Sequence, residues 1–345
     1  MTEQQWNLLC SVISGESNGS IPVGLIIDSP WLPGWAGVSI LDYFHDPAKW
    51  LDANLRAVRE FPDVIFIPGF WAEYGMCSEP AAFGAKCIWY ENSFPSVEKT
   101  IHEMAGINHL AKPNCETDGF QPYLIKRLQN ARKQIEAEGH AIRMAVARGP
   151  LNIASYLTGH TEFLMALKLE PAATHQLLKI VTDFLCDWIR FQVKTFDSID
   201  GMLLLDDLLG FLSPADFEEF ALPYMKAIFD SVDVSVKALH NDAHGLTTAK
   251  YLPQMGVNLF NFSHNHSYEE IFARAGKEVA LLGNIPPRDV LAAGTPEQIE
   301  QSVQNSLLSI PQGCRVIMSC GGGTPPDVTT ENIQALCRAT LAPNT

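Results

Sequence analysis

Short apolar runs recur along the chain at intervals that fit buried β-strands. Eight of these runs are rich in aliphatic and β-branched side chains: residues 21–27, 63–69, 141–147, 201–207, 234–240, 257–263, 278–284 and 314–320. Most are continuously apolar rather than alternating, which is typical of parallel strands covered on both faces. The pattern therefore predicts eight parallel strands.

The segments between these runs show helical spacing. Apolar residues recur at three- and four-residue intervals over 159–196, and Ser213–Pro214 and Thr295–Pro296 mark helix starts for 213–231 and 295–310. Ser and Thr are favoured N-caps, and Pro suits the first helical position. Eight strands that alternate with helices predict an α/β fold, a (β/α)8 TIM barrel forming a single domain over residues 1–345. A doubly wound open sheet is the alternative, but no Gly-rich dinucleotide fingerprint follows the first strand.

One connection is too long for a simple strand–helix unit. The segment at about 70–140 is rich in aromatic residues, Gly and Pro near its start, as in "GFWAEYGMCSEPAAFG". Long loops of a barrel tend to carry function. We expect this segment to be a loop and helical insertion over the barrel mouth, after the second strand.

Composition narrows the class of protein and its partners. The formal net charge of −15 disfavours nucleic acid, because phosphates would be repelled. We see no signal peptide and no apolar run approaching the roughly 20 residues that span a bilayer. The eight cysteines form no CxxC pair, which suggests reduced thiols. We expect a cytoplasmic protein without membrane contact.

Polar side chains gather where the predicted strands end. Active sites of such barrels lie at the carboxyl ends of the strands, and successive strand ends are neighbours around the ring. The residues at these ends are Asp206 and Asp207 after the fourth strand, His240 and Asp242 after the fifth, His264 after the sixth, Asn284 after the seventh and Cys320 after the eighth. We expect some of these side chains to converge.

Four of these residues suit a zinc ion. Imidazole, carboxylate and thiolate are common zinc donors, which makes His240, Asp242, His264 and Cys320 candidates. A catalytic zinc takes about three protein ligands, so one of the four would act beside the metal. Taken singly, each has a structural alternative: a strand-end histidine can cap carbonyls, and Cys320 can be a small buried apolar residue.

Longer stretches carry a family resemblance. "RGPLNIASYLTGHTEFLMALKLEP", "IDGMLLLDDLLGFLSPADFEEFALPYMKAI", "LLGNIPPRDVLAAGTPEQIEQSV" and "MSCGGGTPPDVTTENIQAL" resemble the uroporphyrinogen decarboxylase superfamily from about residue 140 onward. The resemblance implies the same (β/α)8 barrel. It also leaves two functional branches to be separated.

The first branch decarboxylates uroporphyrinogen III without a metal. Its members hold the substrate carboxylates with arginines in an N-terminal "RQAGR"-like motif, and the pyrrole nitrogens with an aspartate. This sequence has no arginine before Arg56, and its first strand continues into "IIDSPWLPGWAG". A substrate with up to eight carboxylates needs cationic partners, so this branch is the weaker alternative.

The second branch comprises cobamide-dependent methyltransferases, which implies Zn2+ and a cobalamin carried by a partner corrinoid protein. In its coenzyme M enzymes a His-x-Cys pair and a later Cys bind zinc. His240 matches the His, Asp242 stands at the first Cys, and Cys320 matches the second. In related cobalamin-independent methionine synthases a Glu ligand lies 22 residues beyond that pair, which here is His264. The resemblance thus implies His240, His264 and Cys320 as metal ligands.

An aspartate in place of the thiolate changes the expected chemistry. A harder ligand makes zinc more Lewis-acidic, which favours demethylation of a methyl ether or similar donor. Methylation of a thiol acceptor stays open, as do the identity of the small molecule and the direction of transfer. A non-catalytic barrel that only binds a corrinoid is a further alternative, and a homodimer is compatible with such a barrel.

Supporting roles fall on other residues. Asp206, Asp207 and Asp242 are the catalytic candidates, which would orient a zinc ligand or hydrogen-bond the substrate. The expected substrate-binding residues are Trp31, Trp35, Trp71, Tyr74 and Asn284. The alternative for the aromatic residues is packing within loops. Glu73 and Glu79 could supply a carboxylate ligand from the insertion.

Overall fold

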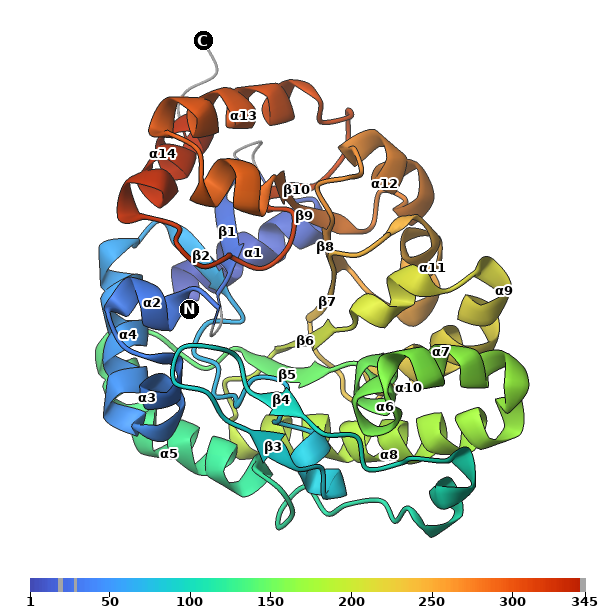
Figure 1. Cartoon of the computed structure of the whole chain (residues 1–345). Helices are drawn as coiled ribbons and strands as arrows, with labels where there is room; N and C mark the ends of the chain where they lie inside the picture. The colour runs from blue at the N-terminus through green and yellow to red at the C-terminus, as the bar shows by residue number, and fades with distance from the viewer. Residues whose placement is uncertain (18–20, 28–29, 342–345) are drawn as a thin grey trace.

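Eight parallel strands form one curved sheet (Figure 1). The structure, a computed structural model, describes residues 1–17, 21–27 and 30–341. The strands are β1 (Val23–Ile26), β2 (Val64–Ile67), β5 (Met144–Arg148), β6 (Gly201–Leu205), β7 (Val236–Asn241), β8 (Leu259–Phe262), β9 (Ala280–Ile285) and β10 (Val316–Cys320). Their order is β2-β1-β10-β9-β8-β7-β6-β5. The eight predicted strands and the TIM-barrel-like fold are confirmed, although no strand pairing joins β2 to β5 in the part of the chain that is described.

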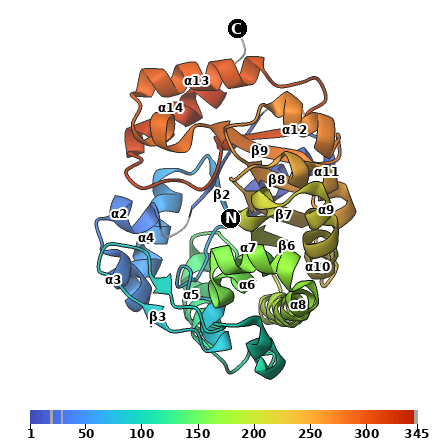
Figure 2. The ribbon, with the colours of Figure 1, turned by 45° about the vertical axis from the view of Figure 1, so that its right-hand side comes forward.

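Helices surround the strands as an outer layer (Figure 2). They are α2 (Leu32–Ala36), α3 (Ile40–His45) and α4 (Pro47–Glu60) after β1; α5 (Gln121–Ala137) after β2; α6 (Pro150–Thr158), α7 (His160–Leu169) and α8 (Pro171–Thr195) after β5; α9 (Pro214–Asp216), η4 (Phe217–Ala221) and α10 (Leu222–Phe229) after β6; α11 (Leu246–Met255); α12 (Tyr268–Ala275); η5 (Pro287–Ala292) and α13 (Pro296–Leu308); and α14 (Thr330–Leu341).

The predicted helix starts are confirmed, but two predicted helices are interrupted. Ser213 accepts a hydrogen bond from the Asp216 amide, and Thr295 forms a capping box with Gln298. The stretch 159–196 divides into α7 and α8 at Pro171, and 213–231 passes through a π-type turn over 217–221. Proline has no N–H to donate and clashes with the preceding turn, which explains the break at Pro171.

The strand side chains alternate between two apolar layers. Val64 and Phe66 face the outer helices, whereas Ile65 and Ile67 join the cluster inside the ring. Helix α1 (Glu3–Ser14) closes the amino-terminal end of the ring with Trp6, Leu9, Val12 and Ile13. A Cβ at Gly201 would lie 2.8 Å from the Trp6 ring, so glycine makes room for this plug. The opposite end of the ring is therefore the one available for a site.

Side chains occupy the open seam between β2 and β5. The Gln192 amide of α8 accepts from the Val146 N–H and donates to the Val146 carbonyl, both at 3.0 Å. Glu79 accepts from the Arg148 N–H at 3.0 Å. Buried backbone N–H and carbonyl groups need hydrogen-bond partners. The Gln192 amide and the Glu79 carboxylate supply them on this edge of β5, where a neighbouring strand would otherwise do so.

The segment after β2 contains a small hairpin and ends in a barrel helix. Its elements are η1 (Pro80–Phe83), the antiparallel pair β3 (Cys87–Ile88) and β4 (Ser96–Val97), and η2 (Met104–His109). Helix α5, which closes the predicted 70–140 segment, packs against α4 in the outer layer. None of the described helices is long and apolar enough to cross a membrane.

Candidate functional site

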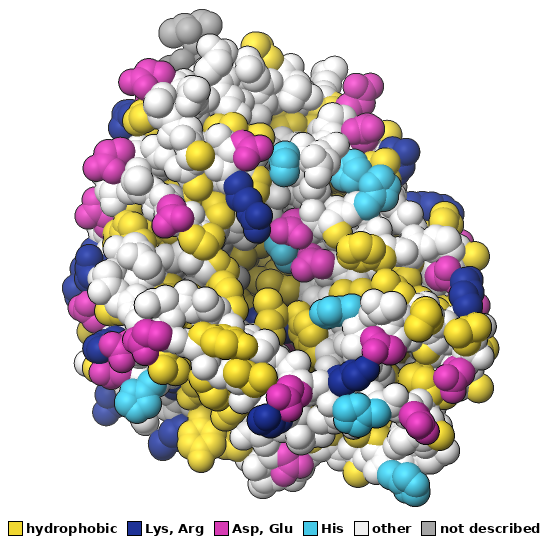
Figure 3. Space-filling model, in the orientation of Figure 1, with side chains coloured by type: hydrophobic (Ala, Val, Ile, Leu, Met, Phe, Trp, Pro, Cys, Tyr) yellow, Lys and Arg dark blue, Asp and Glu magenta, His cyan; other side chains and the backbone are white. Residues whose placement is uncertain are grey.

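The carboxyl ends of the strands surround a hollow on the face shown in Figure 3. Its depths are mainly hydrophobic, and acidic, basic and histidine side chains lie at its margin (Figure 3). The apolar floor comes from the alternation of the strands, because each places every second side chain inside the ring. The polar margin comes from residues at and just after the carboxyl ends of the strands, beyond the side chains that fill the inside of the ring.

Three side chains at this margin form a compact cluster. Asp207, His240 and Asp242 each offer a ligand atom, and these atoms lie within 4.8 Å of one another. His240 Nε2 is 3.7 Å from Asp207 Oδ1 and 4.0 Å from Asp242 Oδ2. His240 and Asp242 meet because residues i and i+2 of a strand point to one side. Of the predicted site residues, the structure brings these three together.

Asn261 of β8 fixes the orientation of the His240 ring. Its amide nitrogen donates to the carbonyls of Leu282 and Cys320, at 2.8 Å and 3.2 Å, so its oxygen is left to face His240. The His240 Nδ1 atom lies 2.7 Å from that oxygen. Since the oxygen can only accept, Nδ1 carries a proton, and Nε2 is the nitrogen that faces the two aspartates. A metal ion held by Nε2 requires this placement of the Nδ1 proton.

Asp207 and Asp242 are held close enough to compete for one proton. The Asp242 backbone N–H donates to Asp207 Oδ1 at 3.2 Å, and the two carboxyl groups hydrogen-bond each other. Desolvation of the carboxyl group within the hollow, where its side chain is still 41% exposed, and the negative charge of Asp242 raise the pKa of Asp207; the charge of a protonated His240 opposes this rise. A divalent cation would satisfy both carboxylates without that proton. The donor set thus fits a metal such as zinc.

Cys320 and His264 lie beside the cluster rather than within it. The Cys320 side chain is fully buried at the end of β10, and its thiol donates to the Gly322 carbonyl at 3.3 Å. Burial raises the pKa of this thiol to about 12. His264 is exposed, and its backbone packs against Gly321, where a Cβ would lie 2.5 Å from the His264 nitrogen.

Asp206 points away from the cluster, into the start of α6. Its Oδ2 accepts from the backbone N–H groups of Leu151 and Asn152 at 2.9 Å and 3.3 Å. Burial raises the pKa of Asp206 to about 8. The Asn284 amide donates to the His266 carbonyl at 2.7 Å, which connects the ends of β8 and β9.

The predicted aromatic wall divides into two groups. Trp31 is buried against Phe66 in the outer layer, and Trp35 packs on Trp31 with ring centroids 5.2 Å apart. Trp71 instead belongs to the cluster inside the ring, beneath the Arg148 guanidinium at 5.7 Å. Tyr74 packs against Phe120 of the insertion and Phe44 of α3. Only Trp71 of these four therefore faces the interior of the ring.

A buried ion-pair cluster lies at the seam beside the site. Arg148, at the end of β5, contacts Glu73 at 3.0 Å and Glu79 at 3.4 Å. Tyr156 of α6 is near Arg148 and donates to the Met76 sulfur at 3.1 Å. Both glutamates are thus engaged with Arg148, and neither belongs to the Asp207–His240–Asp242 cluster.

The family profile for uroporphyrinogen decarboxylase (URO-D) matches residues 10–342. The chain belongs to the URO-D family. It is 26% identical over 302 residues to a uroporphyrinogen decarboxylase of Pseudoalteromonas atlantica, covering 83% of this chain and 78% of that protein. A uroporphyrinogen decarboxylase of Xylella fastidiosa is 24% identical over 325 residues, covering 87% and 86% of the two chains.

Solved structures share the fold of this URO-D family member. A methyltransferase from Methanosarcina mazei superposes with a TM-score of 0.83 at 18% identity, covering 97% of this chain and 98% of that one. A B12-independent methionine synthase from Shewanella gives a TM-score of 0.56 at 9% identity, covering 93% and 97%. At these identities the likeness establishes the fold alone.

Sequence reasoning missed two residues that shape the site of this URO-D family member. Asn261 lies inside the apolar run 257–263, and the pattern of that run predicts a strand but no role for this side chain. Arg148 directly follows the run 141–147, so the rule that polar residues at strand ends carry function could have found it.

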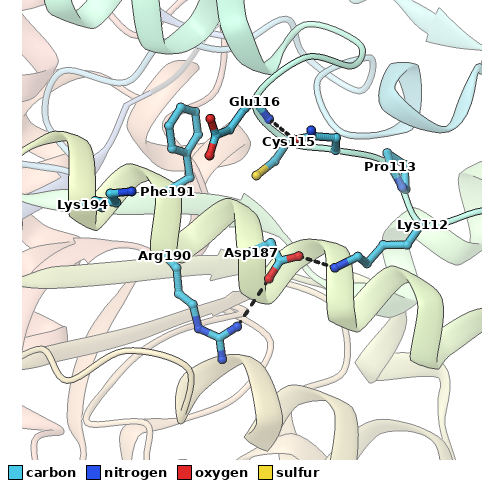
Figure 4. A pocket seen from close by; sticks show the side chains of 9 residues that line it. Lys112, Pro113, Cys115, Glu116, Asp187, Arg190, Phe191 and Lys194 are labelled. Carbon is cyan, nitrogen blue, oxygen red and sulfur yellow. Dashed lines mark hydrogen bonds and ion pairs between the residues drawn. The ribbon is translucent and has the colours of Figure 1, made fainter.

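A separate groove lies between residues 112–116 and α8 (Figure 4). Asp187 pairs with Lys112 and lies 3.4 Å from Arg190, so the carboxylate neutralises two of the groove's cations. The groove is not lined by any member of the Asp207–His240–Asp242 cluster. We assign it no ligand.

Proposed function

We propose that this URO-D family member is a zinc-dependent methyltransferase, which moves a methyl group between a small substrate and the cobalamin of a partner corrinoid protein. The observation that carries the proposal is the His240 ring, which Asn261 orients so that Nε2 faces two aspartates. An imidazole nitrogen and two carboxylates gathered within 4.8 Å are a donor set that suits zinc. The shared fold with the M. mazei methyltransferase is compatible with the proposal.

The proposed ligands are His240 Nε2 and the carboxylates of Asp207 and Asp242. Two carboxylates would balance the charge of the zinc ion. When bound, zinc would act as a Lewis acid on the substrate atom that carries the methyl group. Both aspartate side chains are about half exposed, at 41% and 47%, so a substrate can reach this side of the cluster.

The remaining residues would hold and enclose the substrate. Trp71 and the apolar interior of the ring offer a surface for the substrate's hydrocarbon part. Tyr156 places a hydroxyl near Arg148 and the aspartates, where it can hydrogen-bond a polar group. The chain's contribution is mainly alignment and exclusion of water, which lower the barrier for an in-line methyl transfer.

Uroporphyrinogen decarboxylation is the second candidate, because the curated relatives carry that name. Its substrate carboxylates would need cations at the mouth. Arg148 is buried and already paired with Glu73 and Glu79. We therefore rank this activity below methyl transfer.

A metal-loading and methylation assay tests the two candidates together. The chain is stripped with a chelator and titrated with zinc, and methylation of free cob(I)alamin is followed by absorbance across methyl ethers, methylamines and methyl thioethers. We expect one zinc per chain and zinc-dependent methylation with at least one donor class. His240→Ala should weaken zinc binding at least about 100-fold and abolish the reaction.

Matched variants identify the ligands. His109→Ala removes an exposed histidine in η2 and should change nothing. Cys320→Ala and His264→Ala test the two predicted ligands that lie beside the cluster. A chain that binds no stoichiometric zinc, or whose zinc affinity survives His240→Ala, contradicts the proposal. Turnover of uroporphyrinogen III by the metal-free chain would instead support the second candidate.

A further inference from the structure

Two cysteines of the insertion lie against each other outside the candidate zinc site. Cys87 begins β3, and Cys77 lies in the loop before η1. The Cys77 sulfur is 3.7 Å from the Ser96 carbonyl, and Ser96 is the β4 residue paired with Ile88, next to Cys87. The contact with Ser96 places the Cys77 sulfur against the hairpin beside Cys87. The two thiols are close enough to change each other's acidity.

The two thiols differ in exposure and in acidity. Cys77 is fully buried, whereas Cys87 is partly exposed to solvent. The interaction between the two thiols lowers the pKa of Cys87 and raises that of Cys77, and burial adds to the rise at Cys77. Each of the chain's other six cysteines has its pKa raised, with burial as the main cause. Cys87 is therefore the member of the pair that small oxidants can reach, and the direction of its pKa favours the thiolate.

We propose that Cys77 and Cys87 form a reversible disulfide when the protein meets a hydroperoxide, with Cys87 as the attacking sulfur and Cys77 as the resolving one. The Cys87 thiolate attacks the peroxide oxygen, the O–O bond breaks, and hydroxide or alkoxide leaves and takes up a proton. The Cys77 thiol then loses its proton, its sulfur attacks Cys87, and the S–O bond of the sulfenic acid breaks to release water. Two thiols lose two electrons and two hydrogens, and the peroxide is reduced by two electrons.

The disulfide would fix a segment that reaches the barrel mouth. Met76 directly precedes Cys77, and its sulfur accepts the hydrogen bond from Tyr156. A covalent bond from Cys77 to Cys87 therefore ties the position of Met76 to the β3–β4 hairpin. The modification needs no zinc and no methyl substrate, so it stands or falls independently of the proposed function.

Peptide mapping tests the disulfide directly in the full-length wild-type chain. Trypsin cleaves after Lys86 and separates residues 60–86, which hold Cys77, from residues 87–99, which hold Cys87. The protein is treated with hydrogen peroxide, alkylated and digested without reductant. We expect the two peptides to appear joined, two hydrogens lighter than their sum, and to separate with dithiothreitol. Full alkylation of both cysteines after peroxide treatment would overturn the proposal.

Two variants test the assigned roles. Cys77→Ser should leave Cys87 without a resolving thiol, so that a dimedone adduct of its sulfenic acid accumulates on residues 87–99. Cys87→Ser should leave Cys77 unmodified, because the buried thiol is not activated. Cys186→Ser, which removes a buried cysteine of α8, is the matched control and should still form the linked peptides. Dimedone labelling of Cys77 in Cys87→Ser would contradict the order of attack.

Discussion

At the scale of single residues, the site depends on which nitrogen of His240 carries the proton. Asn261 decides this, because its amide nitrogen is used by two carbonyls and its oxygen alone faces the ring. Such partners are often as important to metal affinity as the ligands themselves. The function proposed for His240 therefore rests on Asn261, its register partner on the neighbouring strand β8.

Replacing Asn261 with Leu should weaken zinc binding without touching a ligand. The leucine keeps the side chain's size but removes the acceptor, so the His240 ring loses its fixed tautomer and orientation. We expect zinc affinity to fall by about 10- to 100-fold. Competition with a chromophoric chelator measures this, with Asn305→Leu on the exposed face of α13 as the control. Unchanged affinity with intact circular dichroism would show that Asn261 does not orient the ligand.

A second residue makes the fold sensitive to acid. Burial, aided by the N-terminal ammonium, lowers the pKa of His140 to about 4. The unfolded chain therefore binds the extra proton first, and stability is lost as the pH falls from about 6.5 to about 4. We expect a loss of about 1–2 kcal/mol, allowing for solvent screening of a half-buried ring. His140→Gln should flatten the urea-unfolding free energy over this window; an unchanged slope would contradict the assignment.

At the scale of elements, the edge of β5 depends on a helix side chain. Gln192 of α8 satisfies both the N–H and the carbonyl of Val146. An amide side chain matches this pair because it carries one acceptor and donors in the geometry of a peptide group. The helix is thereby joined to the strand by polar contacts as well as by packing.

Gln192→Leu should therefore destabilise the protein more than the loss of a surface contact would. It leaves two buried backbone groups without partners, which costs about 2–4 kcal/mol of unfolding free energy. Urea denaturation followed by tryptophan fluorescence measures the change. The same substitution at Gln134, which is exposed on α5, is the control. A loss at Gln192 no larger than that at Gln134 would show that water replaces the amide.

The strands of the large sheet were predictable from the sequence, because burial on both faces determines their apolar pattern. Continuous apolar runs identified all eight strands, because a parallel strand is covered on both faces. The breaks at Pro171 and within 213–231 were missed, since helical spacing continues across them. His240 and Asp242 were predictable as a pair from their i, i+2 spacing, whereas the exposure of His264 depends on how the chain turns after β8.

At the scale of the whole molecule, the eight strands form one curved sheet with two edge strands, β2 and β5. Strand pairing runs continuously from β2 through β1 and β10 to β5, but no pairing joins β2 to β5 among the described residues. Side chains from α8 and from the insertion fill this seam instead. The proposed site lies on β6 and β7, within the continuous part of the ladder, where neighbouring strands hold the ligands in register.

This architecture predicts an uneven pattern of amide exchange. The β8 amides are enclosed by ladder bonds on both sides, so they should exchange only when the whole barrel unfolds. The Val146 and Arg148 amides donate hydrogen bonds to the side chains of Gln192 and Glu79. A change of rotamer breaks these hydrogen bonds while the strands stay paired. We therefore expect these two amides to exchange at least about tenfold faster than those of Phe260 and Phe262. Hydrogen–deuterium exchange resolved by NMR measures the difference, and Gln192→Leu should speed up Val146 while leaving β8 unchanged relative to global stability. Equal protection on both sides of the barrel would mean that the seam opens only when the whole ring unfolds, and that side chains close it as firmly as an eighth strand pairing would.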